Sequence, residues 1–443
     1  MTMTESGTPS GTSVPETKNP PAKSAPVPRA RPWQAYLNEA ALGLNNYWYP
    51  AFFSQELEEG GTLAEEVCGE RMIFKRVKGE VYAVRDRCAH RGVAFSVRPE
   101  CLSDNTLTCW YHGFTYDVRN GELVQVGSHP GSNLIGKLKI PTFKVREAFS
   151  MVWVFIGDED RPFEEDLPPV LQRALSGEER RAFFPVARVK IPSDWRLGME
   201  NGIDAGHVWG HRDAELVRQG PLPNPLGFFP RDTRGVTTDT TPGHAAKMDT
   251  GHTSYENVWT VEIEGNTISA ARLPSDTQAA AQLGEALESF SDTPEKLFDD
   301  LGVYLPGMFV LASFPDGHQV GYEWYVPVDE HHHMYTILAS EIVHSDEEEA
   351  KYLEEYKNRW ADLVWSKDPD LIGFNNFDAF AREQIAHGYD HEDFWQNEHL
   401  YLPDFVITQW RQFVSREARG FVQRGDLAPR PDDPEPSVIK YVH

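Results

Sequence analysis

The sequence predicts an α+β fold in which an all-β domain at residues 47–158 precedes a mixed domain at residues 159–443. Residues 47–158 contain short runs of β-branched and aromatic residues separated by Gly, Asp and Asn, which is typical of strands and turns. After residue 158, strand-like runs occur together with amphipathic helical segments. A chain of 443 residues is also too long for one hydrophobic core, so at least two domains are expected.

Two N-terminal segments precede the all-β domain. Residues 1–32 are rich in Pro, Ser and Thr and contain few apolar residues, so we expect a disordered tail. Residues 33–46, which overlap "RPWQAYLNEAALGL", have apolar residues at near-helical spacing. They predict an N-terminal helix that packs on the second domain.

Six runs with high β propensity predict the strands of the first domain. The stretch "GDEDRPFEEDLPP" that follows them is interpreted as a linker. The six runs are "NYWYPAFFS", "RMIFKRV", "VYAVRDRC", "LTCWYH", "LKIPTFKVRE" and "SMVWVFIGD".

The second domain is predicted to combine helices and strands. "SDWRLGMENGIDAGHVWGH" predicts one helix whose N-cap is Ser193 or Asp194. Residues 213–255 have many turn residues and little periodicity, which predicts a long loop of the kind that covers a site. Strands are predicted in "YENVWTVEIEG", "NTISAARLP" and "VGYEWYVPVDEHHHMYTILASEIV".

A further helix is predicted in "SDEEEAKYLEEYKNRWADLV". Ser345 and Glu348 have the spacing of a capping box at its N-terminus. Tyr352, Tyr356 and Trp360 recur every four residues, which places them on one face that can be buried.

The composition excludes several classes of protein. Hydrophobic residues make up 40% of the chain and aromatic residues 12%, which is sufficient for a globular fold. The net charge of -26 repels nucleic acid and anionic membrane surfaces, favours solubility and leaves room for a partner with a basic patch. No window predicts a transmembrane helix, and the N-terminus lacks the apolar region of a secretory signal. With four cysteines in the chain, a reducing cytoplasm is the expected location.

Two short stretches, "DRCAHRGVAFS" and "TCWYHGFTYD", each combine one cysteine with one histidine. Cys88-Ala-His90 is followed after 18 residues by Cys109-x-x-His112. Two thiolates and two imidazoles suit either zinc or a Rieske [2Fe–2S] cluster, in which two Cys hold one iron and two His hold the other. Zinc ribbons more often use CxxC pairs, so the pattern favours the Rieske cluster.

A second candidate metal site lies in "MENGIDAGHVWGHRD". His207 and His211 are four residues apart, which on a helix directs both rings toward one ion, and Asp204 lies on the same predicted face. A 2-His-1-carboxylate triad would hold Fe(II) and leave positions open for dioxygen. The spacing does not fix the third ligand, and Asp378 in "GFNNFDAFARE" is one candidate among the late acidic residues. Residues 331–333, three histidines after "VPVDE", are interpreted as a solvated turn.

Together these motifs resemble the Rieske non-haem iron aromatic-ring-hydroxylating oxygenases, specifically their large terminal-oxygenase subunit. The resemblance covers residues 33–415 and follows the order CxH, CxxH, E-N-x-x-D-x-x-H-x-x-x-H. "NNYWYPAFFSQEL", "ENGIDAGH", "EWYVPVDE" and "GFNNFDAFARE" are similar to stretches of the carbazole-type members. The resemblance implies a Rieske domain at 47–158, and at 159–443 a catalytic mononuclear-iron domain with an antiparallel sheet flanked by helices.

The resemblance also implies roles for individual residues. It makes Asp378 the third iron ligand beside His207 and His211. It makes Asp204 a bridge that carries electrons from His112 of one subunit to His207 of the next. The implied cluster ligands are Cys88, His90, Cys109 and His112, and the implied substrate-binding residues are Asn201, Gly202, Phe314, Glu323, Phe374 and Asn375.

The implied activity is dihydroxylation of an aromatic or N-heteroaromatic ring with O2, and carbazole-type angular dioxygenation is favoured. A reductase would take electrons from NAD(P)H and a ferredoxin would deliver them, because this chain has no Gly-rich dinucleotide fingerprint after a strand. A homotrimer without a small subunit is also implied. Gly321 departs from the carbazole-type pattern, which has a larger polar residue there.

Three alternatives remain open at this point. A Rieske monooxygenase or demethylase acting on another heteroaromatic or an aromatic amine could use the same iron. A Rieske electron carrier would need only the first domain, and the additional residues with their His/Asp set argue against it. A zinc-stabilised binding module is the third alternative.

Overall fold

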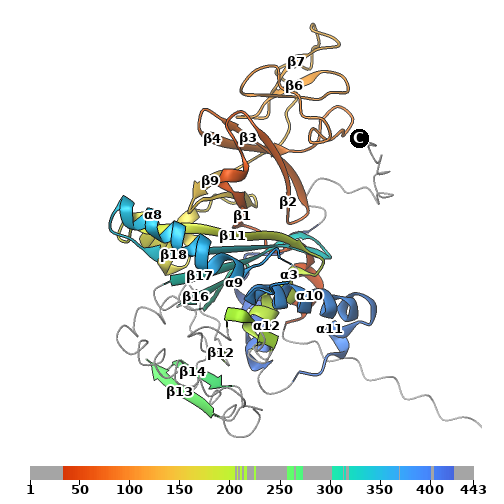
Figure 1. Ribbon diagram of the computed structural model, residues 1–443. Coiled ribbons are helices and arrows are strands. Elements are labelled where there is room, and N and C mark those ends of the chain that lie inside the picture. The colour runs from red at the N-terminus through yellow and green to blue at the C-terminus, as the bar shows by residue number, and fades with distance from the viewer. Residues whose placement is uncertain are drawn as a thin grey trace, which may run out of the picture. The chain divides into compact units, whose positions relative to one another are not determined.

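The structure, a computed structural model, describes most of the chain between residues 33 and 423 (Figure 1). The predicted tail at 1–32 lies outside the described residues, as does most of the predicted loop at 213–255. The described residues are 33–204, 207, 210–211, 214–216, 224–225, 257–263, 266–272, 302–312, 314–315, 319–368, 370–400 and 404–423.

Two small antiparallel sheets carry the Cys/His motifs, in the strand orders β2-β3-β4-β8 and β5-β6-β7. They share a hydrophobic core that includes Ile73, Val84, Leu107 and the two motif cysteines, Cys88 and Cys109. Strands β2, β6 and β7 were not among the predicted strands. The strands are β2 (Thr62–Val67), β3 (Glu70–Val77), β4 (Glu80–Arg85), β8 (Thr142–Phe143), β5 (Thr106–Thr108), β6 (Phe114–Asp117) and β7 (Leu123–Val126).

A third sheet, β1-β10-β9, joins the ends of the predicted all-β region. Every residue of β1 and β10 is buried, and both strands belong to the same hydrophobic core as the second domain. Although this sheet lies at the two ends of the predicted all-β region in sequence, it packs in the core of the second domain. Its strands are β1 (Tyr47–Phe53), β10 (Met151–Ile156) and β9 (Val145–Ala148).

The acidic stretch interpreted as a linker is partly packed into the fold. It forms a 3₁₀ turn, η3 (Phe163–Asp166), in which Phe163 is buried against Trp48 with ring centroids 5.3 Å apart. Asp166 accepts the backbone N–H of Trp48 at 2.8 Å and pairs with Arg419. Residues 157–162 of the stretch are mostly exposed, as expected of a linker, whereas Phe163 and Asp166 are buried, which the acidic sequence did not indicate.

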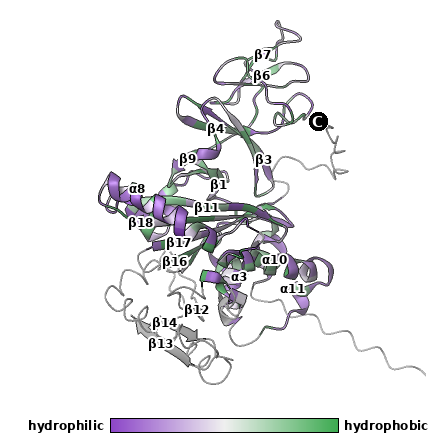
Figure 2. Ribbon diagram, viewed as in Figure 1, coloured by the Kyte–Doolittle hydropathy of each residue, from purple (hydrophilic) through white to green (hydrophobic). Residues whose placement is uncertain are grey.

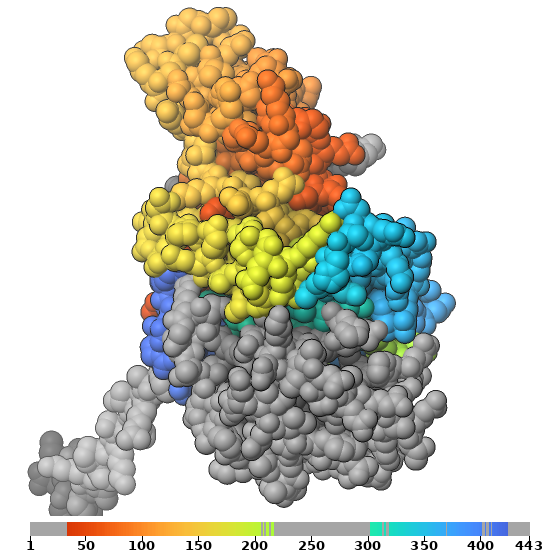
Figure 3. Space-filling view, turned by 90° about the vertical axis from the view of Figure 1, so that its left-hand side faces the viewer, coloured from red at the N-terminus to blue at the C-terminus, as the bar shows by residue number. Residues whose placement is uncertain are grey.

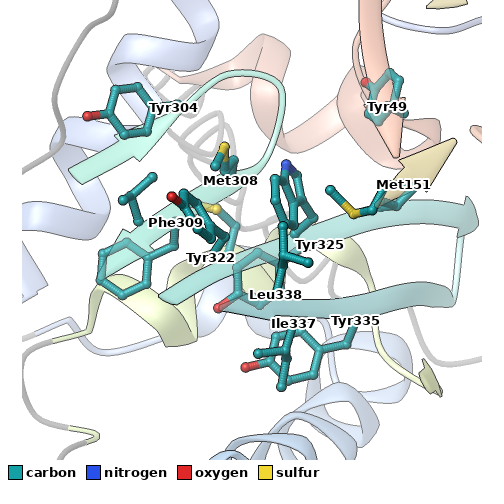
Figure 4. Close-up of a cluster of buried hydrophobic side chains, with 14 of the residues drawn as sticks. Tyr49, Met151, Tyr304, Met308, Phe309, Tyr322, Tyr325, Tyr335, Ile337 and Leu338 are labelled. Atoms are coloured by element: carbon teal, nitrogen blue, oxygen red, sulfur yellow. The ribbon is translucent and has the colours of Figure 1, made fainter. Parts of the chain in front are cut away.

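The second domain is built on a five-stranded antiparallel sheet, ordered β11-β18-β17-β16-β15. Strand β17 is buried from Gln319 to Val328, which explains its nearly continuous apolar and aromatic sequence. Figure 4 shows part of this core, where Tyr322 and Tyr325 lie with Met308 and Phe309. The strands are β11 (Arg181–Ile191), β18 (His332–Ile342), β17 (Gln319–Asp329), β16 (Met308–Ala312) and β15 (Gly302–Tyr304).

The three consecutive histidines do not all lie in a solvated turn, as was predicted. Only His331 is in the turn, because β18 already begins at His332. His333 points into the core, has 0% exposure, and its Nδ1 bonds the Ser193 carbonyl at 2.7 Å. Burial lowers the pKa of His333 to about 3, so this imidazole is neutral at physiological pH. The prediction failed because alternation along a strand sends neighbouring side chains to opposite faces.

Helix α3 lies between the sheet and two later helices. It contacts β17, β18, α10 and α12. The Asp194 side chain caps it by accepting the backbone N–H of Arg196 at 2.8 Å, which is one of the two predicted N-caps. The helices are α1 (Gln34–Glu39), α2 (Pro169–Ser176), α3 (Trp195–Ile203), α8 (Asp346–Glu355), α9 (Ala361–Val364), α10 (Phe374–His391), α11 (Phe394–Asn397) and α12 (Phe405–Glu417).

The N-terminal segment is helical over fewer residues than predicted. Helix α1 is followed at once by a 3₁₀ turn, η1 (Ala40–Leu42). The Arg196 guanidinium donates to the carbonyls of Tyr36 and Leu37, and the Trp195 indole donates to the Ala40 carbonyl at 2.7 Å. These bonds attach the segment to the start of α3.

Helix α8 has the predicted serine N-cap, but the Glu348 carboxylate accepts the His344 N–H at 2.7 Å instead of completing the predicted capping box. The predicted buried face begins on α8 and continues into the π turn that follows it. The Ser345 hydroxyl accepts the Glu348 N–H at 3.1 Å, and Tyr352, Tyr356 and Trp360 are buried. The rest of α8 is hydrophilic (Figure 2). Its outer side lies beside the segment that leads into β11 (Figure 3), where Arg180 pairs with Asp346 and Glu349. The remaining elements are the 3₁₀ turn η2 (Ser54–Glu56), the π turn η5 (Tyr356–Trp360), and the sheet of β12 (Asn224–Pro225), β14 (Asn266–Arg272) and β13 (Asn257–Ile263).

Candidate metal centres

Three side chains from two distant segments converge on one point. Among the described residues, His207, His211 and Asp378 form one group of potential ligands whose ligand atoms all lie within 4.8 Å of one another. Asp378 Oδ1 is 3.4 Å from His207 Nε2 and 3.3 Å from His211 Nε2. These separations suit atoms that share one ion, since ligands about 2 Å from a metal lie about 3 Å apart at right angles. His211 and Asp378 are buried and His207 is half-buried.

The two histidines do not lie on α3, so the prediction of a single helix through both was wrong. The helix ends at Ile203, and Asp204 leaves it with an extended backbone while its N–H bonds back to the Glu200 carbonyl at 2.9 Å. Gly202 and Asp204 have low helix propensity, which favours termination here. His207 and His211 follow in 3₁₀ turns, and their ring centroids are 5.1 Å apart.

Backbone carbonyls fix the orientation of both imidazoles. His207 Nδ1 bonds the Asp204 carbonyl, and His211 Nδ1 bonds the Phe374 carbonyl at 3.0 Å. Because a carbonyl only accepts, each Nδ1 carries the proton and each Nε2 presents a lone pair toward Asp378. His211 Nε2 and Asp378 Oδ1 are buried without a hydrogen-bond partner. Buried polar atoms rarely lack a partner, so this donor set fits a metal ion.

The electrostatics favour the protonation states that a metal requires. Burial opposes the charge on Asp378, but the neighbouring His211, Arg382 and His207 hold the pKa of that carboxyl well below its usual range. Burial lowers the pKa of His207, partly offset by the Asp378 charge. Both shifts favour the form in which the side chain can bind a cation, which is an ionised Asp378 and a neutral His207.

One predicted substrate-binding residue, Phe374, lies against His211, and a second, Phe314, lies against Phe374. The Phe374 ring stacks on His211, with centroids 3.8 Å apart and planes 6° apart. The Phe314 centroid is 5.4 Å from that of Phe374. A Cβ added at Gly321 would lie 2.9 Å from Phe314, so the small residue at this position makes room for the Phe314 ring.

Of the other four, Asn375, Glu323 and Asn201 form polar contacts, and Gly202 packs closely against β17. Asn375 Nδ2 donates to Glu323 Oε1 at 2.6 Å, while Asn375 Oδ1 is buried without a partner. Burial, and then the Asp378 charge, raise the pKa of Glu323. Asn201 Oδ1 accepts from Arg382 Nε at 2.7 Å. Gly202 lies so close to β17 that a Cβ there would be 2.5 Å from the Tyr325 hydroxyl.

The two Cys/His loops have the same backbone hydrogen bonds. In the first, Cys88 N–H donates to the Val93 carbonyl and Gly92 N–H donates to the Cys88 carbonyl, both at 2.8 Å. In the second, Cys109 and Gly113 form the equivalent bonds with the Phe114 carbonyl and the Cys109 carbonyl, at 2.7 and 2.9 Å. Both glycines have left-handed backbones, with φ of 74° and 71°. Each loop therefore holds its cysteine at an equivalent position of a tight turn.

The four side chains of the loops gather at one end of the small core. Both cysteines are 2% exposed, and the His90 and His112 ring centroids are 4.7 Å apart. The backbone N–H groups of Tyr111 and His112 face the Cys109 sulfur, and the Tyr116 hydroxyl is 3.4 Å from Cys88 Sγ. Two buried sulfurs near N–H and O–H donors, with two more accessible imidazoles, fit a Rieske cluster.

Asp204 lies at the end of α3, half-buried. The bond described between Asp204 and His207 uses the backbone carbonyl rather than the carboxylate that was predicted to link them. The inter-subunit bridge therefore stays a prediction.

Sequence reasoning missed two buried residues around this site, Arg382 and Tyr325. Arg382 is fully buried on α10, one turn after Asp378, and Tyr325 donates to Glu323 at 2.6 Å. The available signal was spacing, because Asn375, Asp378 and Arg382 recur on one helix face.

Comparison with known proteins agrees with both parts of the chain. Residues 47–144 match the Rieske [2Fe-2S] domain family, and residues 155–423 match the family described as homotrimeric ring hydroxylase. The chain belongs to the Rieske ring-hydroxylating oxygenases. It is a ring-hydroxylating dioxygenase with a [2Fe–2S] cluster and mononuclear iron as its cofactors, and it forms the terminal oxygenase of its system. The family, the α+β fold and the cofactors predicted from the sequence are confirmed.

Two similar proteins that match over most of the chain are terminal oxygenase components of carbazole 1,9a-dioxygenase. The one from Sphingomonas sp is 35% identical over 88% of this chain and 96% of that protein, and the one from Metapseudomonas resinovorans is 32% identical over 88% and 95%. The solved terminal oxygenase from Nocardioides aromaticivorans IC177 is 34% identical, with a TM-score of 0.68 over 88% of this chain and 98% of that one. Another solved structure is a reduced oxygenase–ferredoxin complex of carbazole 1,9a-dioxygenase, 29% identical with a TM-score of 0.70 over 91% and 96%. Within the described residues, no helix is long and apolar enough to cross a membrane.

Proposed function

We propose that this terminal oxygenase dihydroxylates an N-heteroaromatic ring by carbazole-type angular dioxygenation. The observation that carries the proposal is the convergence of His207, His211 and Asp378 beside the stacked Phe374 ring, in a chain that also has the two Cys/His loops. The similarity to carbazole 1,9a-dioxygenase components supports the substrate class.

The ligands follow from the two groups of side chains. Cys88, His90, Cys109 and His112 hold the Rieske cluster, and His207, His211 and Asp378 hold the mononuclear iron. When bound, the cluster passes single electrons and the iron activates dioxygen for attack on the ring.

The protein's own groups orient the substrate and exclude water. Phe374 provides an apolar ring beside His211, and Phe314 extends this apolar surface next to Phe374. Asn375 Oδ1, buried and without a partner, can accept a hydrogen bond from a ring N–H, and the Gly202 carbonyl is a second candidate acceptor. Glu323 holds Asn375 in place by accepting a hydrogen bond from it, and Asn201 accepts a hydrogen bond from Arg382 on the same helix as Asn375.

Electrons come from NAD(P)H through a reductase and a ferredoxin, and the functional oxygenase is a homotrimer. The ferredoxin complexes among the similar structures and the homotrimeric description of the family support these partners. Asp204 bridges His112 of one subunit and His207 of the next, where it can fix both rings.

The substrate is tested by reconstituting the oxygenase with reductase, ferredoxin and NAD(P)H and supplying carbazole, dibenzofuran or anthranilate under labelled dioxygen. Fastest turnover of carbazole, with both labelled atoms in the ring-opened product, is expected. Incorporation of a single labelled atom, or turnover only of N-methyl substrates, would instead identify a monooxygenase or demethylase.

The electron bridge is tested with Asp204→Ala. This variant should keep both metal centres and lose turnover that is coupled to NAD(P)H. Wild-type turnover with the natural donors would remove Asp204 from the electron route.

A further inference from the structure

Helix α10 buries a polar face next to the proposed iron ligands. Asn375, Asp378 and Arg382 are 1%, 4% and 0% exposed. A helix normally buries an apolar stripe, and a guanidinium removed from water carries a large desolvation penalty. The complete burial of Arg382 therefore needs a compensating interaction.

The contacts of Arg382 join three elements of the domain. Its Nε donates to Asn201 Oδ1 on α3 at 2.7 Å, and its Nη2 donates to the Tyr325 hydroxyl on β17 at 3.3 Å. The guanidinium carbon lies 4.7 Å and 4.3 Å from the ring centroids of Tyr325 and Tyr335. Both tyrosines belong to the buried core in Figure 4, so the cation lies against aromatic faces inside the protein.

Arg382 has no directly paired carboxylate. Among the described residues, no carboxylate oxygen lies within 4.0 Å of it, and its Nη1 has no hydrogen-bond partner. Two buried carboxylates are nevertheless near, because Asp378 is one turn earlier on α10 and Glu323 accepts from the Tyr325 hydroxyl at 2.6 Å. The Arg382 charge acts to lower the pKa of both carboxyls, against the effect of burial.

In this arrangement Arg382 can balance the negative charge of Asp378 without forming an ion pair with it. A direct Arg–Asp ion pair would occupy the carboxylate lone pairs that a metal needs. A guanidinium held one turn away stabilises the negative charge and leaves Asp378 Oδ1 without a hydrogen bond, as the structure shows.

We propose that Arg382 is a positioning residue for the mononuclear iron: it balances the charges of Asp378 and Glu323 without binding either, and through Asn201 it fixes α10 against the end of α3. The segment with His207 and His211 follows that end. The inference rests on the proposed assignment of His207, His211 and Asp378 as the iron ligands.

The test compares iron affinity in holoenzyme carrying Arg382→Gln or Arg382→Lys. Affinity at the mononuclear site is measured by competition with a chelator and followed by the EPR signal of the ferrous site with nitric oxide. The cluster is followed separately by its visible absorbance, and thermal unfolding reports general stability. Arg419→Gln is the matched control, because Arg419 is also a mostly buried arginine over a tyrosine, 3.7 Å from the Tyr47 centroid.

Arg382→Gln should bind iron about 10–100-fold more weakly, as is usual when a group behind a metal ligand is lost, with an unchanged cluster spectrum. Arg382→Lys should recover most of that loss because it restores the charge. Arg419→Gln should lower the unfolding temperature without changing iron affinity. Wild-type iron affinity in Arg382→Gln would overturn the inference, and so would equal losses in the Gln, Lys and Arg419 variants.

A second variant keeps the test decisive where Arg382→Gln does not fold. Asn201→Leu removes the acceptor on α3 while leaving the charge, and it should weaken iron binding in the same direction by a smaller factor. Unchanged affinity in Asn201→Leu would contradict the coupling of α10 to α3. Failure of the proposed iron site itself would be recognised separately, since Asp378→Ala would then retain mononuclear iron.

Discussion

The two regions proposed to bind metal in this chain are built in opposite ways. The Cys/His loops lie within residues 88–114, and each is shaped by two backbone hydrogen bonds around a left-handed glycine. The His207/His211/Asp378 group joins segments more than 160 residues apart, for example through the bond from His211 to the Phe374 carbonyl. The comparison shows that one site is fixed by local turns, whereas the other depends on the packing of α3 against α10.

The two regions also differ in how exposed they are and in the side chains that surround them. The loop cysteines lie at the edge of a small apolar core, and their histidines remain accessible to a partner. The distant group is enclosed with Glu323, Asn375 and Arg382, so its geometry depends on buried charges as well as on backbone. Damage to one region should therefore leave the other intact.

The largest expected effect is that of Asp378→Ala. Loss of a ligand from the group should abolish mononuclear iron and activity, while the cluster, held by local loops, keeps its content and spectrum. Metal analysis and EPR of the reduced protein measure both. Asp390→Ala is the control on the same helix, since Asp390 contacts the exposed His331. Full iron content in Asp378→Ala would show that Asp378 is not an iron ligand, so the contrast between a local and a long-range metal site would not hold.

A smaller effect is expected from alanine at the two turn glycines, and it sharpens the comparison within the loops. A left-handed backbone costs a non-glycine residue about 1–2 kcal/mol, so both variants should destabilise their loop. At Gly113 the new Cβ would also lie 3.0 Å from the Gly127 backbone, whereas at Gly92 it would meet only the Arg87 side chain at 3.8 Å. Gly113→Ala should therefore retain less acid-labile sulfide than Gly92→Ala. The reverse order would show that the loops are not fixed by these turns.

The smallest effect is expected from Tyr116→Phe. The Tyr116 hydroxyl lies 3.4 Å from Cys88 Sγ, and hydrogen bonds to ligand sulfur stabilise the reduced cluster. Its loss should lower the reduction potential without loss of cluster, as measured by a redox titration followed by EPR. Tyr82→Phe, which removes a hydroxyl bonded to the exposed Glu80, should leave the potential unchanged. A potential that does not move in Tyr116→Phe would show that this hydroxyl does not donate to the sulfur.

The residues proposed for the cluster could be picked out from the sequence because they lie close together along the chain at a characteristic spacing. Cys88-x-His90 and Cys109-x-x-His112 place four candidate ligands of two types, cysteine and histidine, on two turns. The cap at Ser345 and the buried Tyr352 face were predictable for the same reason, since each depends on neighbours within one or two helical turns.

The distant site could not be predicted by spacing alone. The helix predicted through His207 and His211 ends at Ile203, and the rings converge because two helices pack, not because of a four-residue interval. Asp378 was suggested by resemblance, and the role of Arg382 depends on contacts with α3 and β17 that no local pattern encodes. His333 was misread because burial is decided by strand register.

The most direct test of the account is to count iron and acid-labile sulfide per chain before and after mild treatment with a chelator. Two independent centres predict about three irons and two sulfides at first. After treatment one iron should be lost with activity, the cluster EPR signal should persist, and Fe(II) should restore turnover. Iron and sulfide that leave together in fixed proportion, or a chain that contains zinc and no sulfide, would contradict the account.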